Sequence, residues 1–375
     1  MSALPTDGRE LVSTATNDGR IRLALRPQQL APLAEGEVLI RVEASPVNPS
    51  DMGLLYAVAD PASARRDGDA LTLDIPEKWR RAVGGRLDQA MRVGNEGAGT
   101  VIAAGNSSEA QALLGRVVAT FGGAMYATYR VARASDCLLL PKGASASEGA
   151  SLTVNPLTAM AMVGQMRRDG KAALVHTAAA SNLGQMLVRY TASEGVPLVN
   201  IVRSPAQVEL LRGLGARHVI DTSADGWNAA LIDALVETDA TLAFDAIGGG
   251  RLAGQLLSAM EAAQVRKGAS YSVYGTNVWK QVYIFGALDT GPTEFTRNFG
   301  LQWGISGFLL TPYLMKAGAE EVAAMRARVV AERATTFASH YTQAVSLSEM
   351  LDPQVTQAAA AKSTGAKLLI DPSRG

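Results

Sequence analysis

One stretch, residues 171–202, restricts the possible folds more than any other part of the chain. It begins with a short apolar run at residues 172–176, which has the length of a buried parallel strand. Small and polar residues follow, and Gly184 then opens a helical pattern. A second apolar run ends the stretch at residues 199–202. Strand, tight turn, helix and strand in this order predict a βαβ unit within a parallel sheet.

The turn of this unit carries small residues that suit a bound dinucleotide. The free backbone N–H groups and the positive dipole end of a helix N-terminus favour anions such as a pyrophosphate. Of the usual Gly-x-Gly-x-x-Gly fingerprint only Gly184 is present, and Ala178, Ala180, Ser181 and Asn182 precede it. Small residues can still let the backbone approach a pyrophosphate, so the turn predicts dinucleotide binding. An ordinary strand-to-helix turn packed with alanines is the alternative.

Arg203 indicates which dinucleotide this site would bind. An Asp or Glu that binds a free ribose 2′-OH is expected about 20 residues past the turn. Arg203 stands there instead, 19 positions beyond Gly184, and Ser204 follows it. A guanidinium group at this place would hold a 2′-phosphate through bidentate hydrogen bonds. The sequence therefore favours NADPH over NADH, and a solvated surface arginine is the alternative.

Length and composition exclude several classes of protein. A chain of 375 residues predicts about two domains. Lys+Arg and Asp+Glu number 35 each, so the chain has no basic field for nucleic acid or anionic lipid. No apolar stretch is long enough to cross a membrane, and the N-terminus has no signal pattern. The single cysteine, Cys137, excludes an intrachain disulfide. We expect a soluble, cytoplasmic protein that acts on a small molecule.

Histidine and cysteine are too few and too scattered for a zinc site. A structural zinc site needs four Cys or His ligands, and a catalytic site needs three protein ligands. The chain offers Cys137 and only three histidines, His176, His218 and His340, all far apart in sequence. The sequence therefore predicts no metal site.

Short strands separated by glycines predict a β-barrel or sandwich in the first part of the chain. A hairpin is expected over residues 12–25, with its turn at 17–19. Further strands or glycine-rich turns leading into strands are expected at residues 37–44, 93–102, 115–121, 122–131 and 138–141. Residues 57–92 are irregular and are predicted to form a long surface excursion with a short helix at 77–82.

Helices and strands alternate from residue 147 onward, which predicts a doubly wound parallel sheet. The expected helices are residues 147–166, 205–214, 227–236, 251–263 and 317–333, and the expected strands are residues 218–220, 240–244, 269–274 and 281–288. Later β segments at 337–345 and 366–370 are expected to rejoin the first domain. The predicted domains are residues 1–152, residues 153–333 and a return segment, residues 334–375.

The order of these parts resembles the medium-chain dehydrogenase/reductase superfamily, most closely its zinc-free branch of quinone oxidoreductases and 2-enoyl thioester reductases. The resemblance rests on residues 47–51, 94–97, 122–129, 154–159, 184–185, 245–249 and 364–368. It implies a GroES-like β-barrel catalytic domain and a Rossmann nucleotide-binding domain. It also implies a homodimer, formed by an exposed edge strand at residues 282–285.

The resemblance implies a set of cofactor-binding residues. They are Asn48 and Thr158 at the nicotinamide, Ser181, Asn182, Leu183, Gly184 and Gln185 at the pyrophosphate, Arg203 and Ser204 at the 2′-phosphate, and Ile247, Gly275 and Phe285 at the adenosine and carboxamide loops. Asn48 lies where the zinc enzymes of this superfamily place metal ligands, so the resemblance also agrees with a zinc-free site.

The activity implied is hydride transfer from NADPH to a quinone or an α,β-unsaturated carbonyl compound. Tyr56 is the candidate proton donor, with a packed core tyrosine as the alternative, and Asp51 is expected to cap a helix. A first alternative function is reduction of 2-enoyl thioesters, for which a basic rim of Arg65, Arg66, Arg80 and Arg81 would hold the carrier. A second is an NADPH-binding protein with little catalysis, like the lens crystallins of this branch.

Overall fold

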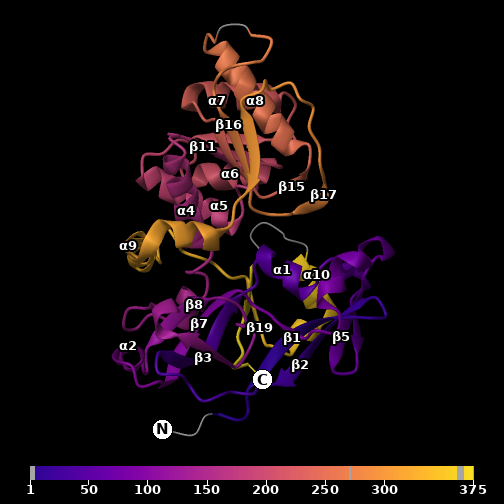
Figure 1. Ribbon diagram of the computed structural model, residues 1–375, viewed down its shortest axis with the longest axis vertical. Coiled ribbons are helices and arrows are strands. Elements are labelled where there is room, and N and C mark those ends of the chain that lie inside the picture. Colours follow the sequence, from indigo (N-terminus) through magenta and orange to yellow (C-terminus); the bar gives the residue numbers. More distant parts are fainter. Residues whose placement is uncertain (1–4, 270–271, 361–366, 375) are drawn as a thin grey trace. The chain divides into compact units, whose positions relative to one another are not determined.

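The computed structural model describes residues 5–269, 272–360 and 367–374, and within them the chain forms two compact units (Figure 1). The first unit comprises Met1–Val154 and Arg328–Gly375, and the second comprises Asn155–Ala327. The domain limits predicted from the sequence stay a prediction, because compactness alone does not show that a segment folds independently.

Two sheets build the first unit, in the strand orders β4-β5-β2-β1-β6 and β10-β8-β7-β3-β20-β19, and β9 also pairs with β3. The strands are β1 (Arg9–Thr16), β2 (Arg20–Pro27), β3 (Glu37–Pro46), β4 (Arg65–Asp67), β5 (Ala70–Asp74), β6 (Met91–Arg92), β7 (Glu96–Ala104), β8 (Val117–Phe121), β9 (Tyr129–Arg133), β10 (Leu138–Leu139), β19 (Gln343–Val345) and β20 (Leu368–Ile370). The helices are α1 (Met52–Leu55), α2 (Ser108–Ala112), α3 (Ala146–Gly149) and α10 (Pro353–Ala360). Because β20 pairs with β3, the end of the chain returns to the first unit, as the sequence pattern predicts.

The predicted first hairpin is confirmed. Strands β1 and β2 pair antiparallel along their whole length, from Arg9 opposite Pro27 to Thr16 opposite Arg20. Gly19 adopts a φ of 82° in the turn, a conformation that favours glycine.

The prediction of a surface excursion at residues 57–92 is wrong. Strand β5 lies within this segment and pairs antiparallel with β2, and the side chains of Leu71 and Leu73 are fully buried. The alternation of apolar and polar residues in Ala70–Asp74 is the signal of a half-buried strand, and the neighbouring Gly and Pro residues obscured it. A 3-10 helix, Glu77–Arg86, stands where a short helix was predicted.

The second unit is built around a six-stranded parallel sheet in the order β13-β12-β11-β14-β16-β18 (Figure 1). Its strands are β11 (Leu174–His176), β12 (Leu198–Val202), β13 (His218–Asp221), β14 (Leu242–Asp245), β16 (Lys280–Ile284) and β18 (Trp303–Gly307), and a small separate sheet pairs β15 (Gly248–Gly250) with β17 (Asp289–Thr293). Its helices are α4 (Asn155–Arg168), α5 (Asn182–Ser193), α6 (Pro205–Gly213), α7 (Trp227–Thr238), α8 (Leu252–Arg266) and α9 (Leu310–Ala331). The predicted doubly wound sheet is therefore confirmed.

Three predictions for this sheet need correction. The strand expected at residues 269–274 is not seen where the chain is described: Val273 and Tyr274 lie in an exposed turn, and residues 270–271 fall outside the described part. Strand β18 was missed. Because β18 pairs with β16, the segment 282–285 is not an edge, and the edge strand of this sheet is Trp303–Gly307.

Each unit has its own apolar core. The core of the first unit packs β1, β2 and β5 against the segment around α1, with Leu23, Leu55 and Leu71 fully buried. The core of the second unit lies between the sheet and helices α7 and α8. In the part of the chain that the structure describes, no helix combines the length and the apolar character needed to cross a membrane.

Candidate functional site

The turn between β11 and α5 is the predicted pyrophosphate-binding site of the second unit. The predicted pyrophosphate residues at this helix start are Ser181, Asn182, Leu183, Gly184 and Gln185. Ser181 caps the helix, since its hydroxyl accepts a hydrogen bond from the backbone N–H of Gly184 at 3.2 Å. A Cβ at Gly184 would lie 2.0 Å from the carbonyl oxygen of Ala179, so only glycine fits. The helix thus begins two residues earlier than predicted, with half-buried residues at its first turn.

Arg203 directly follows β12 and is exposed. Its backbone N–H donates to Oε1 of Gln207 at 3.0 Å, which fixes the start of α6. Among the described residues, no carboxylate pairs with its guanidinium group, and Ser204 stands beside it as the helix N-cap. A free cation at the end of the second strand is the group that a 2′-phosphate would meet.

A buried carboxylate fixes the loop after β14. Asp245 accepts hydrogen bonds from the Thr177 hydroxyl (2.7 Å) and from the backbone N–H groups of Ile247 (3.0 Å) and Gly248 (3.1 Å). Because Thr177 directly follows β11, these bonds tie the two central strand ends together. Asp245 and Thr177 were not assigned roles from the sequence, although Asp245-Ala-Ile-Gly-Gly249 was noted as a motif. Ile247 lies half-buried in this fixed loop.

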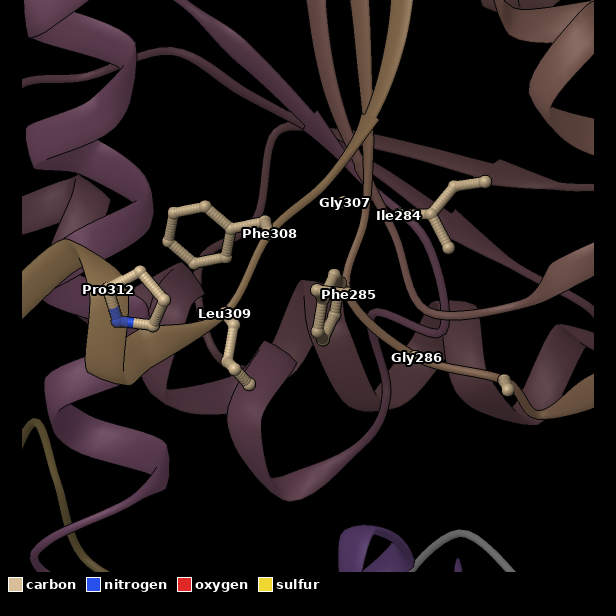
Figure 2. A pocket seen from close by; sticks show the side chains of 8 residues that line it. Ile284, Phe285, Gly286, Gly307, Phe308, Leu309 and Pro312 are labelled. Atoms are coloured by element: carbon tan, nitrogen blue, oxygen red, sulfur yellow. The ribbon is translucent and has the colours of Figure 1, made fainter.

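A mostly apolar pocket of about 520 Å³ lies at the carboxyl ends of β16 and β18 (Figure 2). Its lining residues are Ile284, Phe285, Gly286, Ala287, Gly307, Phe308, Leu309 and Pro312. The ring of Phe285 also stacks on the imidazole of His176, with centroids 5.6 Å apart. Burial lowers the pKa of His176 to about 3, so this imidazole is neutral. Phe285 therefore lines the pocket and also contacts His176, the last residue of β11.

The structure does not bring Gly275 to this edge of the sheet. Gly275 precedes β16 and packs against Gly300, where a Cβ would lie 2.5 Å from the Gly300 Cα. It therefore lies at the amino ends of the strands, opposite the turn that follows β11. Thr158 is buried in α4, which packs against α5.

In the first unit, Asn48 is held between two buried carboxylates. Its backbone N–H donates to Oδ2 of Asp51 at 2.8 Å, and its Nδ2 donates to Oε1 of Glu96 at 2.8 Å. Glu96 is fully buried and also accepts hydrogen bonds from the backbone and hydroxyl of Thr153 and from the backbone of Val154. A carboxylate only accepts hydrogen bonds, so these contacts fix the orientation of the Asn48 amide. Asn48 was singled out from the sequence, whereas Glu96 was noted only within the motif at residues 94–97 and was given no role.

Asp51 does not cap helix α1 through its side chain. Its carboxylate accepts hydrogen bonds instead from the backbone N–H groups of Asn48 and Asn95, both at 2.8 Å. Burial raises the pKa of Asp51 to about 7, and the charge of Glu96 adds to this increase. The bond from Asn48 belongs to a capping box of the 3-10 helix Pro49–Asp51, so Asp51 caps this preceding turn and not α1.

Tyr56 lies in the core of the first unit and is 2% exposed. Its hydroxyl is 3.5 Å from the Thr356 hydroxyl oxygen, and burial raises its pKa to about 12. These contacts are those of a packed tyrosine, so its function as a proton donor stays a prediction.

Within the described ranges, no three His, Cys, Asp or Glu side chains come together as a group that could hold a metal ion. His176 and His218 lie on different strands of the second unit, and Cys137 lies in the first unit. The prediction of a zinc-free protein therefore stays a prediction that rests on the composition of the chain.

Comparison with known proteins places these features in context. No family model matches the chain. It is 26% identical over 225 residues to the bovine mitochondrial enoyl-[acyl-carrier-protein] reductase, covering 58% of this chain and 54% of that protein. The corresponding Xenopus tropicalis protein is 27% identical over 205 residues, which cover 53% of this chain and 51% of that protein. The chain thus spans about half the length of the curated relatives it matches.

Solved structures match nearly the whole chain. A putative NADPH:quinone reductase from Mesorhizobium loti superposes with a TM-score of 0.72 and 23% identity, covering 99% of this chain and all of that one. A mutant enoyl thioester reductase from Candida tropicalis superposes with a TM-score of 0.68 and 19% identity, covering 98% of this chain and all of that one. These matches confirm the predicted fold, a GroES-like unit of antiparallel sheets and a Rossmann-like unit with a parallel sheet.

Proposed function

We propose that this protein is a zinc-independent, NADPH-dependent oxidoreductase that transfers hydride to a quinone or an α,β-unsaturated carbonyl compound. The observation that carries the proposal is the exposed guanidinium of Arg203, without a carboxylate partner among the described residues, at the end of β12. The Gly184 turn supplies the complementary part, a helix N-terminus whose backbone N–H groups favour a pyrophosphate and where packing against the Ala179 carbonyl oxygen leaves room only for glycine. Solved structures of this fold include complexes with NADPH and with NADP, which supports the same cofactor here.

The chain would contribute binding, orientation and a proton. The first turn of α5 binds the pyrophosphate, and Arg203 with Ser204 binds the 2′-phosphate. The amide of Asn48 orients the nicotinamide, and the bound cofactor supplies the hydride chemistry. Tyr56 is the proposed proton donor, and Tyr56→Phe should then lower kcat without changing NADPH affinity. An unchanged kcat would leave Tyr56 a structural residue.

Fluorescence titration with NADPH and NADH tests the cofactor assignment. The Arg203→Ala variant should bind NADPH about 10- to 100-fold more weakly and leave NADH binding unchanged, since it loses charge-assisted hydrogen bonds. Arg212→Ala is the matched control, because Arg212 is also an exposed residue of α6 and already faces Glu209. Equal losses in the two variants would contradict the assignment.

A substrate panel then separates the candidate activities. The wild-type protein with NADPH is assayed with a quinone, an enone and a 2-enoyl thioester. Turnover of the first two supports the proposed function. Tight NADPH binding without turnover of any compound would favour the alternative of an NADPH-binding protein with little catalysis.

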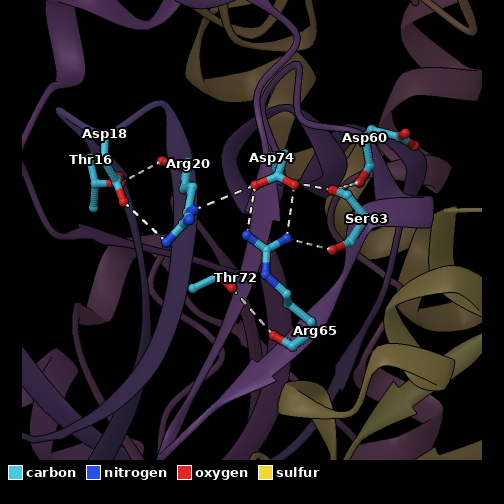
Figure 3. Close-up of polar contacts among 8 residues, drawn as sticks. All are labelled: Thr16, Asp18, Arg20, Asp60, Ser63, Arg65, Thr72 and Asp74. Carbon is cyan, nitrogen blue, oxygen red and sulfur yellow. Dashed lines mark hydrogen bonds and ion pairs between the residues drawn. The ribbon is translucent and has the colours of Figure 1, made fainter.

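The similarity to enoyl-[acyl-carrier-protein] reductases favours 2-enoyl thioesters as a second candidate substrate class. The predicted basic rim gives this only partial support, because carboxylates already engage two of its four arginines, Arg65 and Arg80; Figure 3 shows Arg65 paired with Asp74. Two guanidinium nitrogens of Arg65 donate to Asp74, each at 2.8 Å, and Arg80 pairs with Glu77. Arg81 is exposed and has no carboxylate partner among the described residues.

Arg81 therefore provides the sharper test of the thioester alternative. Arg81→Ala should raise KM for an acyl-coenzyme A substrate and leave KM for a small quinone unchanged, since only the thioester carries phosphates. Arg65→Ala serves as the control, because the Arg65 charge is already neutralised by Asp74. A thioester KM that does not respond to Arg81→Ala would count against a basic rim.

A homodimer formed through β18 and a reducing, cytoplasmic location complete the proposal. Strand β18 pairs only with β16 among the described strands, so its other edge can pair with a second copy. Light scattering of Ile305→Pro tests the dimer, since proline removes a backbone donor from the edge. The single cysteine supports the reducing location, and retention of activity in a chelator would support the absence of zinc.

A further inference from the structure

The turn that leads into β7 holds the side chain of Asn95 on a fixed backbone. The backbone N–H of Asn95 donates to Oδ1 of Asp51 at 2.8 Å, and its carbonyl oxygen accepts a hydrogen bond from the N–H of Gly122 at 3.0 Å. The preceding residue, Gly94, has a φ of 90°, and the ring of Tyr126 occupies the space that a Cβ would need there. The amide of Asn95 is therefore presented from one defined position.

Ser50 lies beside this amide, on a second turn that the same carboxylate fixes. Asp51 accepts the backbone N–H of Asn48 through Oδ2 and that of Asn95 through Oδ1, both at 2.8 Å. Because one carboxylate binds both N–H groups, the turn of Asn48 and Ser50 is adjacent to the turn of Asn95. Across this junction, Nδ2 of Asn95 donates to Oγ of Ser50 at 3.1 Å.

The pair formed by Asn95 and Ser50 has donors to spare. Ser50 is exposed and Asn95 is half-buried. Among the described residues, neither the second N–H of the Asn95 amide nor the Ser50 hydroxyl hydrogen has an acceptor. The amide of the neighbouring Asn48, in contrast, donates to the fully buried Glu96. Two unused donors thus stand beside the residue that is assigned to the nicotinamide.

Hydride transfer to a carbonyl compound needs donors of this kind. When an enone accepts hydride, a C–H bond forms at its β-carbon, its π electrons shift toward the carbonyl group, and the oxygen becomes negatively charged while the nicotinamide is oxidised. The resulting enolate then takes a proton at its α-carbon from the proposed donor, Tyr56. A quinone passes through the corresponding phenolate, so both substrate classes develop negative charge on an oxygen. Preorganised donors that contact this oxygen stabilise the transition state.

We propose that Asn95 and Ser50 bind the carbonyl oxygen of the substrate and stabilise the negative charge that hydride transfer places on it. This inference rests on the proposed function, because that function supplies the hydride and assigns Asn48 to the nicotinamide. It assigns the substrate oxygen to the first unit, at the junction of the two turns.

Kinetics with an enone separate this role from a structural one. Asn95→Asp keeps the size of the side chain and lets the Ser50 hydroxyl donate to it, but it places a negative charge where the oxyanion forms. Removing one oxyanion donor can cost about 100-fold or more, so kcat/KM should fall at least about tenfold in Asn95→Ala. It should fall further in Asn95→Asp, with NADPH affinity unchanged in both. An Asn95→Asp variant at least as active as Asn95→Ala would overturn the inference.

The matched control is Asn106→Ala, which changes an exposed asparagine of the same unit. Asn106 belongs to neither turn, so kcat/KM should stay at the wild-type value. A decrease equal to that of Asn95→Ala would overturn the inference, because the loss would then not depend on the position of the amide.

A titration with 4-nitrophenolate tests the same donors without turnover. This anion carries its charge on an oxygen attached to a flat ring, as the phenolate intermediate does, and its absorbance reports binding. In the presence of NADP+, the wild type should bind it at least about tenfold more tightly than Asn95→Ala does, since hydrogen bonds to an ionised acceptor are the stronger ones. Equal affinities, including no binding to either protein, would overturn the inference.

Ser50→Ala keeps the inference testable if the variants of Asn95 do not fold. Ser50 is exposed, and loss of its hydroxyl should weaken binding of 4-nitrophenolate by about 2- to 10-fold, the range of one hydrogen bond. An unchanged affinity would overturn the inference. If the wild type binds the anion through these residues but reduces no compound of the panel, the proposed function fails and the oxygen-binding site stands.

Discussion

The two units bury opposite charges in different ways. In the second unit, Lys280 and Glu261 are in direct contact, with Nζ 2.5 Å from Oε2, and Thr276 adds two further hydrogen bonds to Glu261. In the first unit, Lys367 forms no ion pair with Glu96 or Asp51 among the described residues, and its Nζ donates to the Ser151 hydroxyl at 2.7 Å. Direct contact lowers the pKa of Glu261 and keeps it charged, although burial opposes this. In the first unit, burial raises the pKa of Asp51 to about 7 and lowers that of Lys367 to about 8.

This difference separates a structural charge pair from a titratable cluster. Lys280 and Glu261 join α8 to the first residue of β16, and Lys280 also donates to the carbonyl oxygen of Val278 at 3.0 Å. They lie at the amino end of the sheet, away from the turn after β11. In the first unit, Asp51, whose pKa lies near neutrality, contacts Asn48, and such pKa values are typical of functional sites.

The largest expected effect comes from breaking the direct pair. Lys280→Met leaves Glu261 buried without its cation and should reduce the free energy of unfolding by about 3–5 kcal/mol, measured by urea denaturation. Lys267→Met is the control, because Lys267 pairs with Asp239 at the surface and should cost less than about 1 kcal/mol. Similar losses in both variants would show that the contact between Lys280 and Glu261 is not structural.

The titratable cluster should appear in the pH dependence of stability. The folded protein holds a proton on Asp51 up to about pH 7, whereas the unfolded chain releases it near 3.8, so this group makes stability fall as pH rises between these values. Lys367 has the opposite effect, since its pKa is about 8 when folded and 10.5 when unfolded, and stability rises across that interval. Each pKa unit corresponds to about 1.4 kcal/mol.

Denaturation of Asp51→Asn and Lys367→Met at several pH values measures these two slopes by difference from the wild type. The first variant should lose the decrease between about pH 4 and pH 7, and the second should lose the increase between about pH 8 and pH 10.5. Slopes that match those of the wild type in both variants would place the cluster among ordinary structural charges.

Glu96→Gln should have a smaller effect on stability. The amide keeps one acceptor oxygen but puts an NH2 group where N–H and O–H donors point, so at least one buried donor loses its acceptor. We expect a loss of about 1–3 kcal/mol in urea denaturation. Glu148→Gln is the control, since Glu148 accepts hydrogen bonds from Ser145 in an exposed capping box. A loss no greater than that of the control would show that the Asn48 amide is not fixed by Glu96.

The same comparison shows what could be predicted from the sequence. The βαβ unit and the β1–β2 hairpin follow from local periodicity and turn chemistry, so they were found. Strand β18 was missed because Trp303–Gly307 contains two glycines and one β-branched residue, too little to distinguish it from a loop. Gly184 was recognised in its turn, but its close approach to Ala179 required the backbone geometry.

The charge clusters lay beyond sequence reasoning. Ser151 and Lys367 are 216 positions apart, and Asn48 and Glu96 are 48 positions apart, so no periodic pattern connects them. For Tyr56, the sequence suggested a function, and the structure shows a packed residue. Its position next to a motif suggested a function, whereas its burial depends on packing against Thr356, near the end of the chain. Local signals predict elements, but partners brought together by the fold decide which polar residue is titratable and which is structural.

A variant of His176 should have the smallest effect on stability, and it tests whether the second unit holds a buried group that is neutral when folded. It is buried in the second unit, and neither ring nitrogen has a hydrogen-bond partner among the described residues. Unlike Lys367, it has no charged group among the causes that shift its pKa, only burial, so it is neutral across the physiological range.

Replacing an unsatisfied polar ring with an apolar ring of similar shape is nearly neutral or stabilising, so His176→Phe should change the free energy of unfolding by less than about 1 kcal/mol. Because the folded imidazole has a pKa of about 3 and the unfolded one a pKa of 6.5, the stability of the wild type should fall as pH drops through this interval, and His176→Phe should lack that slope. A loss of several kcal/mol at pH 7, or a slope at acid pH equal to that of the wild type, would contradict a buried, neutral His176 in the folded protein.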